Sequence, residues 1–296
     1  MKKQLSVIMV LLIIVFLGFA IVIPVLPTLV DTSNFTIMLS VYSLMGFIMS
    51  PVWGRLSDRH GRRPFIMIGT ILYSISFLIF GLAGTNLPLM YVSRILGGIA
   101  SGAVTSTAIA YVADISTDEQ RTKSMGLVGM SIGLGFVLGP AFGGILSKIN
   151  IELPFYLSAV LSFVAFIVAA RSLPESLTAE KRVHPANQPS RWTAFQGIVK
   201  YLYVISFIVS FTLAGMEGTL FYFEAARFHL DSYLFGIMFL INGLVGAVIQ
   251  GWFVRKYVKK GTEERYIVIG LLLSAAGFFL LLLSSNIINA TIYLSV

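Results

Sequence analysis

The 296-residue chain has the composition of a protein that crosses a membrane several times: 57% of its residues are hydrophobic and only 11% are charged, whereas soluble domains carry about 25% charged residues. It has no cysteine, which excludes disulfides, thiolate metal sites and cysteine nucleophiles. The net charge of +8 would suggest nucleic-acid binding in a soluble chain, but here its meaning depends on where the cations lie.

The chain begins with Met1-Lys2-Lys3 and an apolar run to Val30. This run is longer than the roughly 7–15 residues of a signal-peptide core, so we expect an uncleaved first span. Apolar windows near the ~20 residues that cross a bilayer then follow one another along the chain. They predict nine spans and the start of a tenth at Ile287: Leu5–Val30, Thr36–Trp53, Pro64–Leu82, Leu87–Val112, Ser124–Leu146, Leu153–Ala170, Tyr201–Phe223, Tyr233–Val254 and Tyr266–Ser284.

The cations follow these spans in an asymmetric way. If the N-terminus is cytoplasmic, 18 of the 21 lysines and arginines fall in cytoplasmic segments, two (Lys148 and Arg227) fall outside, and Arg94 lies within a span. Cytoplasmic loops of membrane proteins carry such an excess. The net charge therefore indicates a cytoplasmic N-terminus, and nucleic acid is not an expected partner.

A polar stretch with three prolines, from Pro174 to Arg191, follows the sixth span. It predicts a flexible cytoplasmic linker. We therefore expect a six-helix bundle over residues 1–173, a linker over 174–198 and a partial second bundle over 199–296. The chain stops inside an apolar segment, so we also expect an interrupted sequence with about nine and a half helices.

The loop between the second and third spans carries four arginines and one acid in a fixed pattern. By itself it reads as a tight basic turn held on the cytoplasmic side. The pattern resembles the signature loop of the major facilitator superfamily of transporters, for which it implies a conformational latch. The matching residues are Gly54, Leu56, Asp58, Arg59, Gly61, Arg62 and Arg63.

Further patterns lie in the first, fourth and fifth spans. Leu17-Gly18 followed by Pro24 and Pro27 resembles the first span of proton-coupled drug exporters. Arg94 with Gly97, Gly98 and Gly102 resembles the family's intramembrane arginine motif, although such an arginine could also snorkel to the interface. A set of small residues in the fifth span resembles the antiporter motif of the family: Gly135, Gly139, Pro140, Gly143 and Gly144.

Glu217 lies within the seventh span, where an acid is costly and usually functional. The resemblance to the drug:proton antiporter branch, with its NorA-like multidrug efflux pumps, implies that Glu217 couples protons to drug export. Desolvation is expected to raise its pKa. The second coupling acid of that branch would lie beyond Val296. The resemblance also implies a substrate cavity lined by Phe19, Ile23, Tyr42, Arg94, Ile132, Phe136 and Phe221.

These observations predict an all-α membrane protein with the major facilitator fold, acting by alternating access in a bacterial cell membrane. We expect a monomer that handles protons and a small amphipathic or cationic drug, with no cofactor and no metal. The acids Asp114, Asp118 and Glu119 are read as a solvated, capped turn. Two alternatives stay open: a sugar or metabolite exporter of the same superfamily, and a truncated remnant that does not transport.

Overall fold

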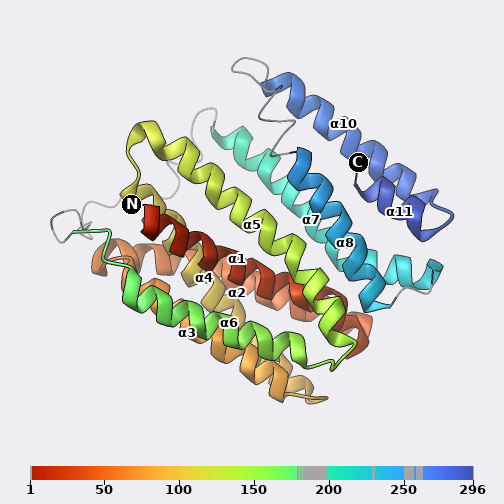
Figure 1. Ribbon diagram of the computed structural model, residues 1–296, viewed down its shortest axis with the longest axis horizontal. Coiled ribbons are helices and arrows are strands. Elements are labelled where there is room, and N and C mark those ends of the chain that lie inside the picture. The colour runs from red at the N-terminus through yellow and green to blue at the C-terminus, as the bar shows by residue number, and fades with distance from the viewer. Residues whose placement is uncertain are drawn as a thin grey trace.

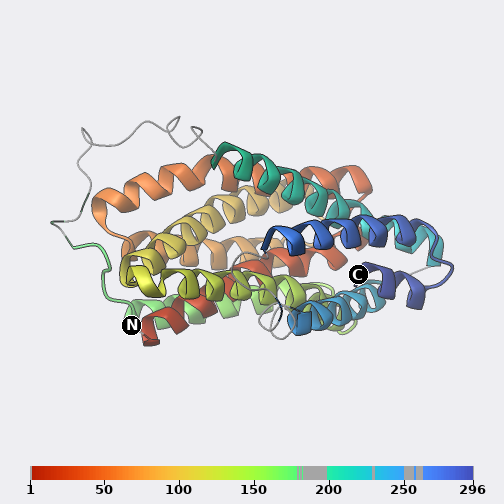
Figure 2. The ribbon, with the colours of Figure 1, turned by 90° about the horizontal axis from the view of Figure 1, so that it is seen from above.

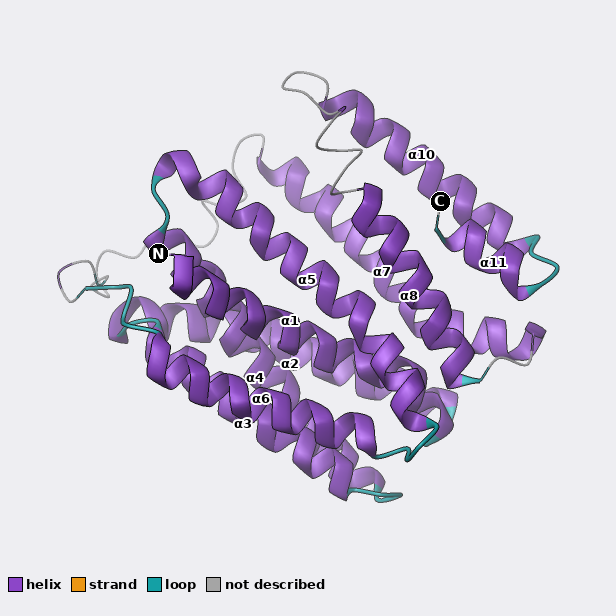
Figure 3. Cartoon of the chain, in the orientation of Figure 1, coloured by secondary structure: helices purple, strands orange, loops and turns teal. Residues whose placement is uncertain are grey.

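The computed structural model describes residues 2–178, 180, 182, 199–228, 231–249, 257 and 263–295. In this part of the chain the regular structure is helical (Figures 1 and 3). The N-terminal half contains six α-helices and one short 3-10 turn: α1 (Lys2–Val25), η1 (Leu26–Thr28), α2 (Thr32–His60), α3 (Arg63–Leu82), α4 (Leu87–Ile115), α5 (Asp118–Ser147) and α6 (Leu153–Ser172). The C-terminal half contains α7 (Val199–Phe228), α8 (Ser232–Val248), α10 (Glu263–Leu282) and α11 (Ile287–Leu294).

The helices confirm the predicted order of apolar spans. Among the described residues, seven helices are long and apolar enough to cross a membrane, and shorter apolar helices follow at 232–246 and 268–282. The helix α11 begins at Ile287, where the tenth window was expected to begin. The chain is therefore a multi-pass helical protein.

The predicted tight loop over 54–63 was wrong in its extent, because α2 continues through it to His60. Arg59 and His60 occupy the last turn, where cations complement the helix dipole. Gly61 then ends the helix with a φ of 103°, which favours glycine, and donates its N–H to the Ser57 carbonyl at 3.0 Å. Only Gly61 and Arg62 separate α2 from α3.

The six N-terminal helices pack closely, with α1 against α5 and α6, and α4 against α2 and α3 (Figure 2). Small residues permit the contact between α2 and α4. A Cβ at Gly98 would collide with the Tyr42 carbonyl, and a Cβ at Gly102 would lie 3.0 Å from the Gly46 carbonyl oxygen. This is the close approach that small-residue helix faces allow.

The two halves contact each other mainly through α5 and α8. We call the end of the molecule that holds Gly61 and the start of α5 the basic end, and the other the Ser232 end. At the Ser232 end, the Ser232 hydroxyl donates to the Pro24 carbonyl at 2.5 Å. An apolar cluster joins α1 with α7, α8, α10 and α11 through Ala20, Ile23, Leu220, Phe221, Phe235, Met238, Leu281 and Ala290.

Toward the basic end the halves separate. A Cβ placed at Gly126, Gly129 or Gly133 of α5 would meet nothing within 4 Å, and the same holds for Gly246 of α8. Closer to the Ser232 end, Gly144 lies against Ser232 and Gly236 lies against the Pro140 carbonyl. The halves are thus packed together at the Ser232 end and spread apart at the basic end.

Candidate transport site

A cavity of about 250 Å³ lies among α1, α2, α4 and α5. Three of the predicted cavity residues, Phe19, Tyr42 and Phe136, line it. The ring centroid of Phe19 is 5.1 Å from that of Tyr42 and 5.8 Å from that of Phe136. Such aromatic walls suit flat apolar compounds. The rest of the lining is Val15, Phe16, Ser43, Gly46, Ser50, Ser101, Gly102 and Thr105.

Three other predicted cavity residues do not line this space. Ile23 is 1% exposed and belongs to the cluster between α1 and the C-terminal helices. Ile132 packs against the cluster of α1, α3, α4 and α6, one helical turn nearer the basic end of α5 than Phe136. Phe221 packs against Phe235, with ring centroids 5.2 Å apart, and lines a different cavity at the Ser232 end.

Arg94 is not a residue that snorkels to the interface, because it is only 1% exposed. Its guanidinium carbon lies 4.3 Å from the ring centroid of Phe80, 5.2 Å from Phe77 and 5.9 Å from Tyr42. Nη2 donates to the Ser93 hydroxyl at 3.4 Å. In the described part of the chain no carboxylate forms an ion pair with Arg94, so aromatic faces stabilise this buried cation. It lies behind Tyr42 and does not line the cavity.

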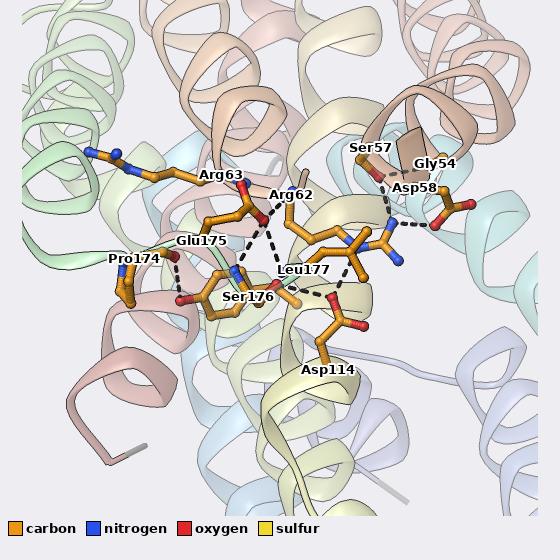
Figure 4. Close-up of polar contacts among 11 residues, drawn as sticks. Gly54, Ser57, Asp58, Arg62, Arg63, Asp114, Pro174, Glu175, Ser176 and Leu177 are labelled. Atoms are coloured by element: carbon orange, nitrogen blue, oxygen red, sulfur yellow. Dashed lines mark hydrogen bonds and ion pairs between the residues drawn. The ribbon is translucent and has the colours of Figure 1, made fainter. Parts of the chain in front are cut away.

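At the basic end, Arg62 is the centre of a polar network (Figure 4). Its side chain is buried, and its Nη1 lies 2.5 Å from Asp58 Oδ1 and donates to Ser57 Oγ at 2.7 Å. Its Nε donates to Asp114 Oδ2 at 3.1 Å. The partners of Arg62 among the described residues all belong to the N-terminal half. The network therefore joins α2, α3 and α4 into one unit.

Asp114 and Glu175 are members of this network that the sequence reading missed. Asp114 was expected in a solvated turn, but it pairs with Arg62 and accepts from Ser176 Oγ at 3.0 Å. Glu175 accepts the backbone N–H groups of Arg62 at 2.7 Å and Arg63 at 3.1 Å, and so caps the start of α3. Only the patterned loop itself was visible in the sequence.

The same network includes the glycine that separates α2 from α3. A Cβ at Gly61 would collide with the Glu175 carboxylate. Arg63 donates through Nη2 to the Ala170 carbonyl of α6 at 2.7 Å, whereas Arg59 is exposed. Gly54 accepts the Ser57 hydroxyl at 2.8 Å. The motif thus fixes the ends of three neighbouring helices.

The small residues of α5 allow neighbouring helices to pack closely against it. A Cβ at Gly135 would lie 2.6 Å from the Phe16 side chain, and one at Gly139 would lie 2.7 Å from the Leu17 carbonyl oxygen. Gly143 faces Ile21 of α1. Gly144 and Pro140 instead face α8. These residues let α5 lie against α1 in its own half and against α8 in the other.

The predicted coupling acid, Glu217, lies on α7, and its side chain is outside the described residues. A second acid, Glu224, lies two turns later on the same helix and is completely buried. Its place directly after Phe223 puts it one residue beyond the apolar window read from the sequence. A search of the sequence for acids that extended each apolar window by one helical turn would have included Glu224.

Two helical bundles that pack together at one end and separate at the other, with an aromatic cavity inside the N-terminal bundle, are typical of membrane transporters. The sequence comparisons agree. The Major Facilitator Superfamily profile matches residues 8–296. The chain belongs to the Major Facilitator Superfamily.

Its relatives include transporters named for drug resistance. The chain is 32% identical to Multidrug resistance protein 2 of Bacillus subtilis over 278 residues, which are 88% of this chain and 68% of that protein. It is 29% identical to Quinolone resistance protein NorA of Staphylococcus aureus over 292 residues, which are 97% of this chain and 75% of that protein. A crystal structure of the human organic anion transporter MFSD10 has a TM-score of 0.80 at 23% identity, covering 99% of this chain and 81% of that one, and it supports the fold alone.

Proposed function

We propose that this protein exports small amphipathic or cationic compounds by alternating access, in exchange for protons. The observation that carries the proposal is the cavity with Phe16, Phe19, Tyr42 and Phe136 on its walls. Aromatic faces bind flat apolar groups and cations without demanding one shape. The names of the bacterial relatives support the same substrate class.

A sugar or metabolite exporter is the second candidate, because Ser43, Ser50, Ser101 and Thr105 also line the cavity. Ser101 donates to the Gly98 carbonyl at 3.1 Å, and Thr105 donates to the Ser101 carbonyl at 2.7 Å. These two hydroxyl protons are engaged within α4 and are not directed to a substrate. The balance of the lining therefore favours apolar substrates, and competition of ethidium export by drugs but not by sugars would separate the two candidates.

We assign the basic end to the cytoplasm, since the cations concentrate there. With that orientation the separated ends of the halves open the protein inward, and the contacts at the Ser232 end close it outward. Transport also requires a conformation that is open at the Ser232 end and closed at the basic end. The Arg62 network is suited to keep the N-terminal bundle rigid as it moves between the two conformations. Glu217 is the acid that we propose to load and release the coupled proton.

The test of this function is proton-driven uptake into vesicles that contain the purified chain. Glu217→Gln should abolish substrate accumulation driven by an imposed pH gradient while leaving substrate binding largely intact, because the amide resembles the protonated acid. Glu119→Gln, an exposed acid at the basic end, is the matched control and should accumulate substrate normally. Undiminished accumulation by the Glu217→Gln variant would contradict the role of this acid.

A further inference from the structure

Glu224 is an acid buried without a hydrogen-bond partner among the described residues of the C-terminal half. It is 0% exposed, and neither carboxyl oxygen has a hydrogen-bond partner among the described residues. It follows Leu220 and Phe221 by one helical turn, and these two residues pack into the apolar cluster with Phe235 of α8 and Leu281 of α10. The carboxyl therefore lies on the apolar face of α7 that meets the other C-terminal helices.

The nearest cation on the same helix is engaged elsewhere. Arg227, three residues later, donates through Nη1 to the Leu282 carbonyl at 2.7 Å. Its guanidinium carbon also lies 5.6 Å from the ring centroid of Phe223 and 5.8 Å from that of Phe228. No ion pair joins Arg227 and Glu224 in the described part of the chain.

Within the described residues, the neighbouring elements supply no other compensating charge. Asp231 caps α8 and Asp31 caps α2 through backbone N–H groups, and both are exposed. Lys148, which directly follows α5, lies over the Tyr233 ring, 3.5 Å from its centroid. The sequence of α1 after Lys3, and that of α10 and α11 after Arg265, contains no charged residue.

An ionised carboxylate in such a place loses its hydration and gains no hydrogen bond from the described residues in return, so the neutral acid is favoured. We propose that Glu224 is a second proton-binding site, distinct from Glu217, and that it holds a proton in the conformation closed at the Ser232 end. When that end opens, water reaches the carboxyl and the proton is exchanged with it. The part of this inference that concerns transport rests on the proposed function, whereas the bound proton does not.

A partly polar cavity lies near this region. A cavity of about 260 Å³ at the Ser232 end is lined by the polar residues Thr28, Ser147, Lys148, Asp231 and Ser232, together with Ile151, Phe221 and Tyr233. Phe221 is three residues before Glu224 on α7, so this cavity ends one helical turn from the carboxyl. The Ser232–Pro24 hydrogen bond and the Phe35–Tyr222 ring contact, with centroids 5.4 Å apart, join the halves beside it. Separation of the halves here would hydrate Glu224.

Infrared spectroscopy of the full chain in lipid at neutral pH tests the bound proton. The difference spectrum between wild type and Glu224→Gln should contain the C=O band of a protonated carboxylic acid, and Glu217→Gln should retain that band. Glu224→Gln should also fold as stably as the wild type, because the amide replaces a neutral group. If the difference between wild type and Glu224→Gln contains only bands of an ionised carboxylate, the proposal is wrong.

A second measurement uses the unaltered chain, so its result does not depend on whether the variant folds. Dicyclohexylcarbodiimide reacts with protonated carboxyls in apolar surroundings, so at neutral pH it should modify Glu224 and leave the exposed Asp31 and Asp231 unmodified. Modification of Glu224 that needs the same acidification as Asp231 would overturn the proposal. Loss of gradient-driven transport in Glu217→Gln together with an ionised Glu224 would leave the proposed function intact and refute this inference alone.

Discussion

The two ends of the molecule differ in how the halves pack together and in whether their buried charged groups are paired. At the basic end the halves are apart, yet Arg62, Asp58, Asp114 and Glu175 satisfy one another within the N-terminal half. At the Ser232 end the halves are packed together, yet Glu224 is buried without a partner among the described residues. At the open end the buried cation Arg62 is paired inside one bundle. At the closed end we propose a proton site beside the contact between the bundles. Opening the Ser232 end would therefore change the protonation of the protein, whereas closing the basic end need not.

The largest expected effect concerns which end faces the cytoplasm. The chain has no cysteine, so single cysteines can be introduced at Glu119 at the basic end and at Thr85 at the other end, both of which are exposed. In intact cells an impermeant maleimide should label Thr85→Cys and not Glu119→Cys. The opposite pattern would reverse the orientation and with it the assignment of the open side.

The next largest effect is expected in the Arg62 network. Arg62→Ala leaves Asp58 and Asp114 without their buried cation, and breaking such a pair costs about 3 kcal/mol of folding free energy. Arg59→Ala is the matched control, because Arg59 is exposed near the end of α2. Thermal unfolding in detergent should show a clear loss of stability for the first variant and little change for the second. Equal stability of the two variants would show that the network does not hold the bundle together.

A smaller effect is expected from two glycines of the same helix. Gly139→Ala places a methyl group 2.6 Å from the Ala20 Cβ, and such overpacking costs about 1–3 kcal/mol. Gly129→Ala enters open space and should be neutral or stabilising, since alanine favours the helix by about 1 kcal/mol. Unfolding temperatures of the pair measure the difference. A stable Gly139→Ala variant would mean that α5 and α1 are less closely packed than described.

The sequence predicted the order of the spans because hydropathy measures the cost of placing side chains in lipid. It left the polar last turns of α2 and the polar start of α5 outside the predicted spans, because hydropathy does not include the dipole and tertiary contacts that stabilise such turns, as at the end of α2. Glu175 contacts residues more than a hundred positions away, which no local pattern encodes. The sequence also did not predict how far along α5 the cavity extends: Ile132 and Phe136 share a helix face one turn apart, yet only Phe136 lines the cavity.

Alternating access predicts that the two ends open and close in a reciprocal manner, and this can be measured with two pairs of spin labels on the cysteine-free chain. One pair, at Glu119 and Lys200, reports on the basic end, and the other, at Ile149 and Ala226, reports on the Ser232 end; all four residues are exposed. Changing the pH or adding tetraphenylphosphonium should shorten the first distance in the same fraction of molecules in which it lengthens the second. Distances that stay fixed at both ends while the labelled protein exports substrate would contradict the mechanism.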